Sequence, residues 1–271
     1  MYFMETSNKN PLISIITISR NNAVGIEKTI KSVINQTYNN IEYIIIDGAS
    51  TDGTVNVIKK YNSQITFWIS EPDSGIYNAM NKGIKQSKGE YIMFLNSGDE
   101  LYEPHCLYNI VSQADYFDIV YSNLKMVNEK KTFIKESPRK LTFQYFTNNA
   151  IPHPATLIKR KLFNSLGLYD ESLKIVSDWK WFMIAICKMN ASYKKTDILA
   201  AKFYEDGISS NESHSTILEK ERENVLHREF PLYTDDYRRL NKYDMMIYNL
   251  NFPRRIVNWI KRKTYKSYKR I

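Results

Sequence analysis

Strand-like apolar runs alternate with helix-like patterns along the first half of the chain. Leu12–Ile18 and Ile41–Ile46 are rich in β-branched residues, as buried parallel strands are, and Ile65–Ile69 and Tyr91–Leu95 have the same character. Between the first two runs, apolar side chains recur at helical spacing over residues 23–36. Four strand–helix repeats predict an α/β fold with a mostly parallel central sheet and helices on both of its faces.

The alternation is less regular after about residue 122. Strand-like stretches near residues 132–134, 155–158 and 192–204 accompany a helix that we expect over 178–188. No Gly/Ser-rich linker, low-complexity segment or internal repeat separates the two halves. One compact domain with two functional halves therefore fits better than two separable domains.

Acidic residues follow two of the predicted parallel strands. Asp47 stands directly after the second strand, and Asp99 ends a short loop after the fourth. Open α/β sheets bind their ligands at the carboxyl ends of the strands. Between the two acids, Glu71–Gly83 has the pattern of a turn that opens into a helix. The arrangement predicts a site for a phosphorylated ligand and a divalent metal.

Five motifs, taken in chain order, resemble the landmarks of family 2 glycosyltransferases. They are Pro11–Ile18, Ile46–Thr54, Asp73–Gly83, Gly89–Asp99 and Ser177–Trp179. The resemblance covers about residues 11–210, and five motifs in register are far more specific than any one alone. It implies the GT-A fold with a Rossmann-like, mostly parallel central sheet, a nucleotide-sugar donor, a divalent cation and inversion at the anomeric carbon.

Within this resemblance, five residues of the first half correspond to donor contacts. Asp47 matches the acid that accepts a hydrogen bond from the nucleobase, and the alternative is an acid that caps its own turn. Thr17 lies at the predicted end of the first strand, where the family places the base; the alternative is an ordinary strand threonine. Asp73 matches a further donor-contacting acid and is also a candidate helix N-cap. Asn81 and Lys82 match weaker donor contacts, and the alternative for Lys82 is a solvated surface position.

The metal assignment rests on Asp99, which matches the last acid of the family's Asp-x-Asp motif. The resemblance implies that it binds Mn²⁺ or Mg²⁺, which stabilises the charge on the departing nucleoside diphosphate; the alternative is a turn aspartate. Ser97 stands where the first acid of the motif is expected, and we count it with the donor-binding residues. His214, in a segment expected to act as a lid, is a candidate further metal ligand or a plain loop residue.

The candidate general base is Asp178, which matches the acid at the start of the helix beneath the acceptor. Inversion in one displacement requires a group that removes the proton of the acceptor hydroxyl. The alternative for Asp178 is a helix N-cap, and Trp179 and Trp181 are either a stacking face for a sugar or core residues. His153, in a Pro-His-Pro loop, corresponds to a contact with the diphosphate or the acceptor, and a structural hydrogen bond is the alternative.

The net charge of +9 is concentrated at the C-terminus. Residues 252–271 include eight basic side chains and no acidic one, with apolar residues on the opposite side of a helical projection. The pattern predicts an interfacial helix on an anionic membrane; a packed helix with a solvated basic face is the alternative, and no nucleic-acid-binding motif accompanies the charge. We expect a GT-A domain over 1–235, with a nucleotide-sugar half at about 11–122 and an acceptor half at about 123–235, and a basic amphipathic helical tail over 236–271.

Other features of the sequence predict a cytoplasmic protein. No run of about 18 uncharged apolar residues predicts a transmembrane helix, and the first residues lack the pattern of a secretory signal. Cys106 and Cys187 have no CxxC spacing, which favours buried thiols in a reducing compartment. With the basic tail, we expect a peripheral protein on the inner face of the cell membrane. The aromatic-rich stretch Tyr233–Tyr248 is a candidate contact in a homo-oligomer.

The residues of the predicted site are compatible with three functions. The leading one is a bacterial glycosyltransferase that moves a sugar from a UDP-sugar to a hydroxyl group of a lipid-linked saccharide or glycan acceptor in surface-polysaccharide biosynthesis, the setting resting on family analogy. The second is a nucleotidyltransferase, for which Arg20–Asn22 is a poor substitute for a Gly-rich phosphate loop. The third is a catalytically weak nucleotide-sugar-binding protein, which Ser97 favours and the joint presence of Asp47, Asp99 and Asp178 disfavours.

Overall fold

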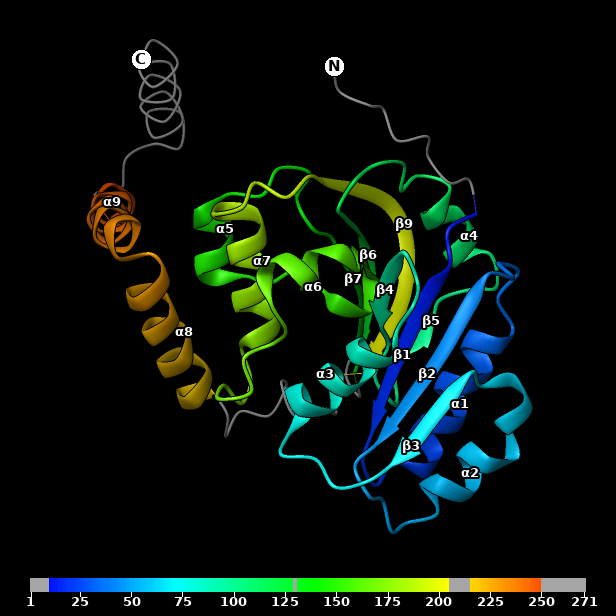
Figure 1. Cartoon of the computed structure of the whole chain (residues 1–271). Coiled ribbons are helices and arrows are strands. Elements are labelled where there is room, and N and C mark those ends of the chain that lie inside the picture. The colour runs from blue at the N-terminus through cyan, green and yellow to red at the C-terminus, as the bar shows by residue number, and fades with distance from the viewer. Residues whose placement is uncertain (1–9, 129–130, 205–214, 250–271) are drawn as a thin grey trace. The chain divides into compact units, whose positions relative to one another are not determined.

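A computed structural model of the protein describes residues 10–128, 131–204 and 215–249 (Figure 1). Its contacts divide the chain into two units, residues 1–222 and residues 223–271. The first unit is a sheet with helices on both faces, and the described part of the second unit is helical. The division at residue 222 falls within helix α8 (Ser215–Glu229), whereas the sequence analysis expected the boundary at residue 235.

Parallel strands form the first half of the sheet, as predicted. They are β1 (Ile13–Ser19), β2 (Ile41–Asp47), β3 (Phe67–Ser70) and β4 (Tyr91–Phe94). Their order in the sheet is β3-β2-β1-β4, and every neighbouring pair is parallel. The register pairs Ser19 with Asp47, so the ends of β1 and β2 lie side by side.

The second half of the sheet is mixed. Its strands are β5 (Glu100–Leu101), β6 (Ile119–Val127), β7 (Thr132–Lys135), β8 (Thr156–Lys159) and β9 (Tyr193–Tyr204). Strand β8 lies between β4 and β6 and is antiparallel to both, whereas β9 is parallel to β6. Strand β7 pairs with β6, and β5 pairs with β9. The less regular sequence pattern after residue 122 corresponds to this mixed pairing.

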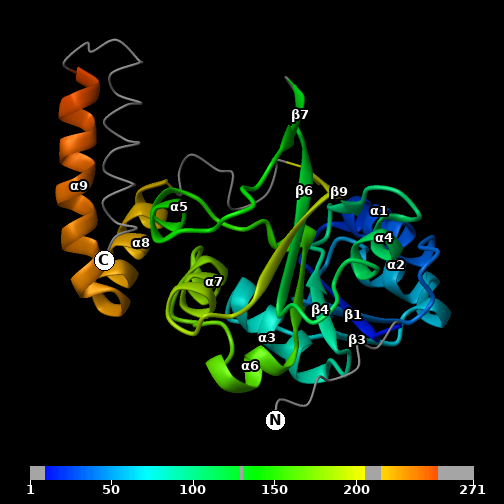
Figure 2. The same cartoon turned by 90° about the horizontal axis from the view of Figure 1, so that it is seen from above.

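Helices cover the sheet on two sides. They are α1 (Ala23–Ile34), α2 (Thr54–Lys60), α3 (Ile76–Gln86), α4 (Cys106–Val111), α5 (Phe143–Asn148), α6 (Lys161–Leu166) and α7 (Ser177–Cys187), with single turns η1 (Asn62–Gln64) and η2 (His153–Ala155). Figures 1 and 2 show α1, α2 and α4 on one face and α3, α6 and α7 on the other. The amphipathic pattern of α1 explains its docking, because Ile26, Ile30 and Val33 are buried.

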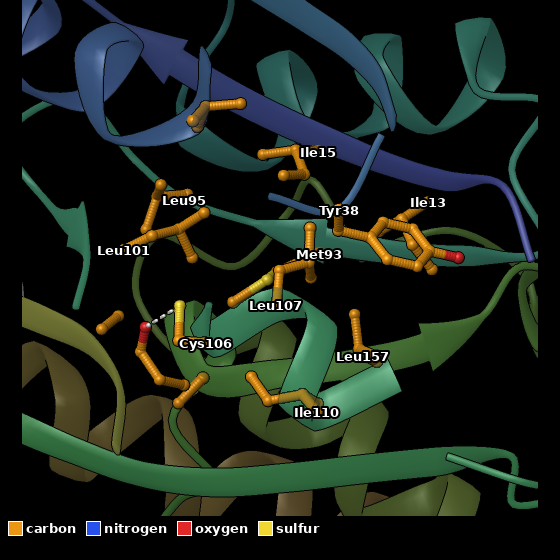
Figure 3. Packing of buried hydrophobic residues seen from close by; sticks show 14 of the residues in the cluster. Ile13, Ile15, Tyr38, Met93, Leu95, Leu101, Cys106, Leu107, Ile110 and Leu157 are labelled. Carbon is orange, nitrogen blue, oxygen red and sulfur yellow. Dashed lines mark hydrogen bonds between the residues drawn. The ribbon is translucent and has the colours of Figure 1, made fainter. Parts of the chain in front are cut away.

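The main hydrophobic core lies between the sheet and the helices α1 and α4 (Figure 3). Ile15 and Met93 from the central strands meet Leu107 and Ile110 from α4 in this cluster. Cys106 belongs to the same cluster, and its thiol donates to the Ala200 carbonyl at 3.3 Å. Burial raises the pKa of the Cys106 thiol, as expected for a structural cysteine.

The described part of the second unit ends in a long helix with many exposed apolar side chains. Helix α8 (Ser215–Glu229) runs into this unit, and α9 (Pro231–Asn249) follows. The exposed large apolar residues of α9 are Leu232, Tyr233, Leu240, Tyr243, Met245 and Met246. The basic tail from Phe252 onward lies outside the described residues. None of the helices within the described ranges has the length and apolar character needed to cross a bilayer.

Candidate functional site

The ends of the central parallel strands form one polar edge of the sheet. Ser19 and Asp47 pair at the ends of β1 and β2, and the Ser97 amide after β4 donates to the Ile18 carbonyl at 3.0 Å. We call residues 19–22, 47–51 and 96–99 the carboxyl edge. Its position matches the edge at which open α/β sheets bind ligands. The sequence-based expectation that Asp47 and Asp99 lie at the same edge therefore agrees with the topology.

Asp47 is fully buried and holds the turn that follows β2. Its Oδ1 accepts from the Ser50 hydroxyl at 2.5 Å, and its Oδ2 accepts from the Ser50 amide at 2.9 Å and the Ser70 hydroxyl at 2.6 Å. These are the contacts of the alternative role, an acid that caps its own turn. A carboxylate has about four acceptor positions, so these three bonds leave Oδ1 able to accept one more.

The loops after β1 and β2 are tied to each other and hold unusual backbone conformations. Asn21 and Ala49 have φ angles of 50° and 55°, in the left-handed region. The Asn21 amide donates to the Ser50 hydroxyl at 2.7 Å, and the Thr51 amide donates to Asn21 Oδ1 at 2.8 Å. Such backbone strain costs on the order of 1–3 kcal/mol per residue and gathers at functional sites. The loops after β1 and β2 are therefore joined by hydrogen bonds on both sides of Asn21.

Asp73 lies against the turn that Asp47 holds. Its Oδ1 accepts from the Gly75 amide at 3.0 Å, and a Cβ at Gly48 would come within 2.3 Å of its Oδ2. Glycine at position 48 is what permits this close approach. Asp73 is not the N-cap of α3, the second role considered for it, because that N-cap is Gly75 without a side-chain bond. The structure thus brings Asp73 next to the Asp47 turn.

Thr17 does not lie at the end of its strand, so that prediction was wrong. Strand β1 continues to Ser19, and Thr17 is fully buried. Its hydroxyl donates to the Leu95 carbonyl at 2.8 Å and lies 3.1 Å from the Tyr43 hydroxyl. These contacts correspond to the alternative of an ordinary strand threonine. Ser19 is the residue of β1 that reaches the carboxyl edge.

Asn81 and Lys82 are both engaged by other parts of the protein. Asn81 is 2% exposed; its Nδ2 donates to the Tyr169 carbonyl and to Glu171, and its Oδ1 accepts from the Tyr169 amide at 3.0 Å. Lys82 forms an ion pair with Glu71 at 2.7 Å. The Asn81 amide thus fastens α3 to the segment before α7. These contacts favour structural roles for both residues over the expected donor contacts.

Three buried polar atoms at the carboxyl edge lack a hydrogen-bond partner among the described residues. They are Ser19 Oγ, Asn96 Oδ1 and Ser97 Oγ. Buried polar groups in folded proteins are nearly always paired with protein, water or ligand. These three atoms lie at the ends of the neighbouring strands β1 and β4, where they are available to a bound ligand or to water.

Asp99 follows these residues in a loop with a fixed backbone. It is 5% exposed, its carbonyl accepts from the Thr29 hydroxyl at 2.7 Å, and Gly98 before it has a φ of 107°. Among the described residues no group of three or more Asp, Glu, His or Cys side chains could hold a metal. The oxygen chemistry of Asp99 fits Mn²⁺ or Mg²⁺, which also takes water and phosphate oxygens as ligands. His214 lies outside the described residues.

Asp178 lies in the first turn of α7, with 17% of its side chain exposed. Its Oδ1 accepts from the Tyr77 hydroxyl at 2.8 Å, and its Oδ2 lies 3.3 Å from His153 Nδ1. Burial raises the pKa of the carboxyl, but the bonds from His153 and Tyr77 outweigh it, so the net pKa lies below its usual range. The carboxylate is ionised and can accept a proton. The alternative N-cap role does not hold, because the N-cap of α7 is Val176.

His153 joins Asp178 to the carboxyl edge. It lies in η2, and its Nε2 is 3.2 Å from Nδ2 of Asn96. The structure thus connects the predicted base with the loop that carries Asp99. Both ring nitrogens of His153 contact protein groups, which corresponds to the alternative of a structural hydrogen-bonding histidine.

Trp179 and Trp181 belong to the core. They are 2% and 4% exposed, and their indole N–H groups donate to the carbonyls of Phe146 and Gly167. Trp181 also stacks on Phe163, with ring centroids 4.5 Å apart. Of the two roles that the sequence left open for these tryptophans, the structure shows the core role, because α7 packs that side against α5 and α6.

Sequence reasoning missed three residues of the site. Ser19 lies one residue beyond the expected end of β1, and because neither Ser19 nor Arg20 is β-branched, the sequence pattern contains no signal that extends the strand to it. Tyr77 and Asn96 lie within two of the five family motifs, but the sequence contains no signal for their contacts with Asp178 and His153. Such contacts depend on packing between distant segments.

A comparison with protein-family models matches the chain to "Glycosyl transferase family 2" over residues 14–167. An uncharacterised glycosyltransferase of Rickettsia typhi is 32% identical over 232 residues, which cover 80% of this chain and 72% of that protein.

Solved structures agree in fold. The Staphylococcus aureus protein TarS, residues 1–349 with UDP-GlcNAc, aligns with a TM-score of 0.62 at 19% identity, over 80% of this chain and 70% of that one. The mannosyltransferase PcManGT of Pyrobaculum calidifontis, with GDP-Man and Mn²⁺, aligns with a TM-score of 0.57 at 16% identity, over 75% of this chain and 60% of that one.

Proposed function

This chain belongs to glycosyltransferase family 2 and has the GT-A fold, and we propose that it transfers a sugar from a UDP-sugar to an acceptor hydroxyl group with inversion at the anomeric carbon. The observation that carries the proposal is the carboxyl edge with its unpartnered Ser19, Asn96 and Ser97 atoms, joined to an ionised Asp178 through His153. A polar ligand edge and a proton acceptor within one network are what a single displacement requires.

In this proposal Asp178 is the general base. The acceptor hydroxyl loses its proton to the carboxylate as its oxygen attacks the anomeric carbon, and the bond to the nucleoside diphosphate breaks on the opposite face. The lowered pKa of Asp178 favours the ionised form at neutral pH. Its partial burial limits the water that competes with the acceptor.

The donor occupies the carboxyl edge. Asp47 retains one acceptor position for a nucleobase N–H, and Asp73 and Ser97 stand beside it as further donor contacts. Asp99 is the residue that would hold Mn²⁺ or Mg²⁺. The ion, when bound, would supply positive charge that stabilises the leaving diphosphate. Uridine is our choice of base, supported by the UDP-GlcNAc in TarS, although PcManGT holds GDP-Man.

The acceptor is a lipid-linked saccharide or glycan of bacterial surface-polysaccharide assembly. The support is the C-terminal chemistry: α9 exposes Leu240, Tyr243 and Met246, and eight basic residues follow it without an acidic one. Apolar and basic groups together favour the headgroup region of an anionic membrane. We therefore propose a peripheral protein on the inner face of the cell membrane.

A donor screen tests the proposed function. The protein is mixed with UDP-, GDP- and dTDP-sugars, with and without Mn²⁺, and its unfolding temperature and the release of free nucleotide are measured. We expect a rise in unfolding temperature and slow nucleotide release only with UDP-sugars and Mn²⁺. Stabilisation without any release, even with added glycan acceptors, would favour the catalytically weak binding protein instead.

A further inference from the structure

A continuous series of contacts runs from helix α3 to the loop after β4. Tyr77 contacts Asp178 Oδ1 at 2.8 Å, Asp178 Oδ2 contacts His153 Nδ1 at 3.3 Å, and His153 Nε2 contacts Asn96 Nδ2 at 3.2 Å. The four residues come from α3, α7, η2 and the segment after β4, so four separate pieces of chain meet here.

The chemistry of the two outer partners assigns the proton on His153. An amide nitrogen such as Asn96 Nδ2 can only donate, so His153 Nε2 must accept and bears no hydrogen. A carboxylate can only accept, so Nδ1 must carry the hydrogen that it donates to Asp178. The histidine is therefore neutral, with its hydrogen on Nδ1, and both of its nitrogens are satisfied by protein.

We propose that His153, in this Nδ1–H form, is a positioning residue that fixes the carboxylate of Asp178 relative to the Asn96–Asp99 loop. Its two contacts hold the carboxylate of Asp178 at a fixed distance from the carboxyl edge. The inference rests on the proposed function only in treating Asp178 as the base. It differs from the sequence-based expectation, because both nitrogens contact protein rather than diphosphate or acceptor.

The surroundings of Asp178 make the histidine the main neighbour to test. Tyr77 on α3 donates to the carboxylate, the fully buried Tyr169 hydroxyl lies within its electrostatic reach, and so does Arg222 on α8. Among all the neighbours of Asp178, His153 lowers the pKa of its carboxyl group most. Removing its Nδ1–H should therefore raise that pKa and leave Oδ2 of the carboxylate without this contact, while Tyr77 still contacts Oδ1.

The first test is spectroscopic and needs no substrate. The full-length protein is labelled with ¹⁵N-histidine, and long-range correlation spectra report which ring nitrogen of each of its four histidines is protonated. The His153 signal is assigned by its absence in His153→Asn. The Nδ1–H form at neutral pH supports the proposal. The Nε2–H form or a doubly protonated ring overturns it, whatever the enzyme transfers.

The second test compares His153→Asn with His153→Gln, because an asparagine amide nitrogen replaces Nδ1 and a glutamine amide nitrogen replaces Nε2. With UDP-glucose, UDP-galactose and UDP-GlcNAc plus Mn²⁺ as probes, we expect kcat for UDP release to fall about tenfold to a hundredfold in the Gln variant and to recover largely in the Asn variant. In a plot of kcat/KM against pH, the fall on the acidic side should move to higher pH only in the Gln variant.

His105→Gln serves as the control, because His105 is exposed at the start of α4 and its ring contacts the Thr37 hydroxyl at 3.0 Å, not Asp178. Equal losses in the Asn and Gln variants, or a fall on the acidic side that does not move, would overturn the positioning role. If the wild-type protein releases UDP from none of the probes, the proposed function fails. The spectroscopic test of the His153 tautomer then still supports or overturns the proposed contacts, because it does not depend on activity.

Discussion

The Tyr77 hydroxyl lies 2.8 Å from Oδ1 of Asp178, although the two residues are 101 positions apart in the chain. The Tyr77 ring also packs on Tyr169, with centroids 5.7 Å apart. This contact joins α3, which follows the Asp73 turn beside the carboxyl edge, to α7, which carries the proposed base. The contact therefore joins a helix of residues 11–122, the expected nucleotide-sugar half, to a helix of residues 123–235, the expected acceptor half.

Tyr77→Phe should slow sugar transfer without weakening donor binding. The change removes the hydroxyl that Asp178 Oδ1 at 2.8 Å shares with the Ile175 carbonyl at 2.5 Å. We therefore expect kcat to fall about tenfold while KM for the UDP-sugar stays within about twofold. Steady-state UDP release measures both constants. Tyr108→Phe, which changes an exposed tyrosine, is the matched control. An unchanged kcat in Tyr77→Phe would show that this bond does not assist the base.

Asp178→Asn should abolish transfer while the donor still binds. An amide of the same shape cannot take a proton, and a general base contributes about a hundredfold to ten-thousandfold to rate. Calorimetric titration with UDP and Mn²⁺ should give nearly the wild-type affinity. Asp197→Asn, at an exposed carboxylate, controls for loss of a charge. Near-normal turnover in Asp178→Asn would exclude it as the base.

Asp99→Asn should remove the dependence of UDP binding on Mn²⁺. A neutral amide is a weaker ligand for a hard divalent ion than a carboxylate is. We expect titrations of this variant to give the same weak UDP affinity with and without Mn²⁺, whereas the wild type binds more tightly with the ion. Asp115→Asn is the control, because asparagine tolerates the left-handed backbone found there. A retained effect of Mn²⁺ would contradict the ligand role.

Glu27→Gln should lower stability at neutral pH but not in acid. Bonds from Lys60 at 2.9 Å and Tyr61 at 2.8 Å, with Lys31 nearby, lower the pKa of Glu27 from 4.5 to about 2. A lowered folded-state pKa stabilises the protein above pH 4.5, and the stabilisation is lost as the pH falls toward about 2.

The difference in unfolding temperature between wild type and Glu27→Gln should therefore shrink over that pH interval. It should also shrink at high salt, since these groups are exposed to solvent. A difference that is constant from pH 7 to pH 3 would show that the ion pairs between α1 and α2 do not contribute through charge.

Replacing two tail lysines should weaken binding to anionic membranes. Each basic residue near such a surface contributes about 1 kcal/mol, so Lys261→Gln with Lys263→Gln should reduce liposome binding by roughly thirtyfold. Co-sedimentation with phosphatidylserine-containing vesicles measures the change. The pair Lys59→Gln with Lys140→Gln, at exposed positions of the sheet-containing unit, matches the loss of charge. Equal effects of the two pairs would place the membrane contact elsewhere.

The sequence predicted the elements of the fold well because their signals are local. The apolar runs at Leu12–Ile18 and Ile41–Ile46 correspond to β1 and β2 within one residue at each end, and the helix expected over 178–188 corresponds to α7. Burial on both faces of a parallel strand demands continuous apolar residues, so the pattern is visible in the sequence itself. The family and the enzyme class were confirmed as well.

Residue identity and spacing were enough to show which side chains have suitable chemistry for the site: the acids after two strands, the acid at the start of α7 and the histidine between two prolines. Which of these side chains contact one another follows from the three-dimensional packing. In the folded protein Thr17 is buried and donates to the Leu95 carbonyl. Asn81 donates to the Tyr169 carbonyl, and His153 contacts Asp178. The physical reason is that a polar side chain's partner is set by packing between segments far apart in the chain, which no local pattern records.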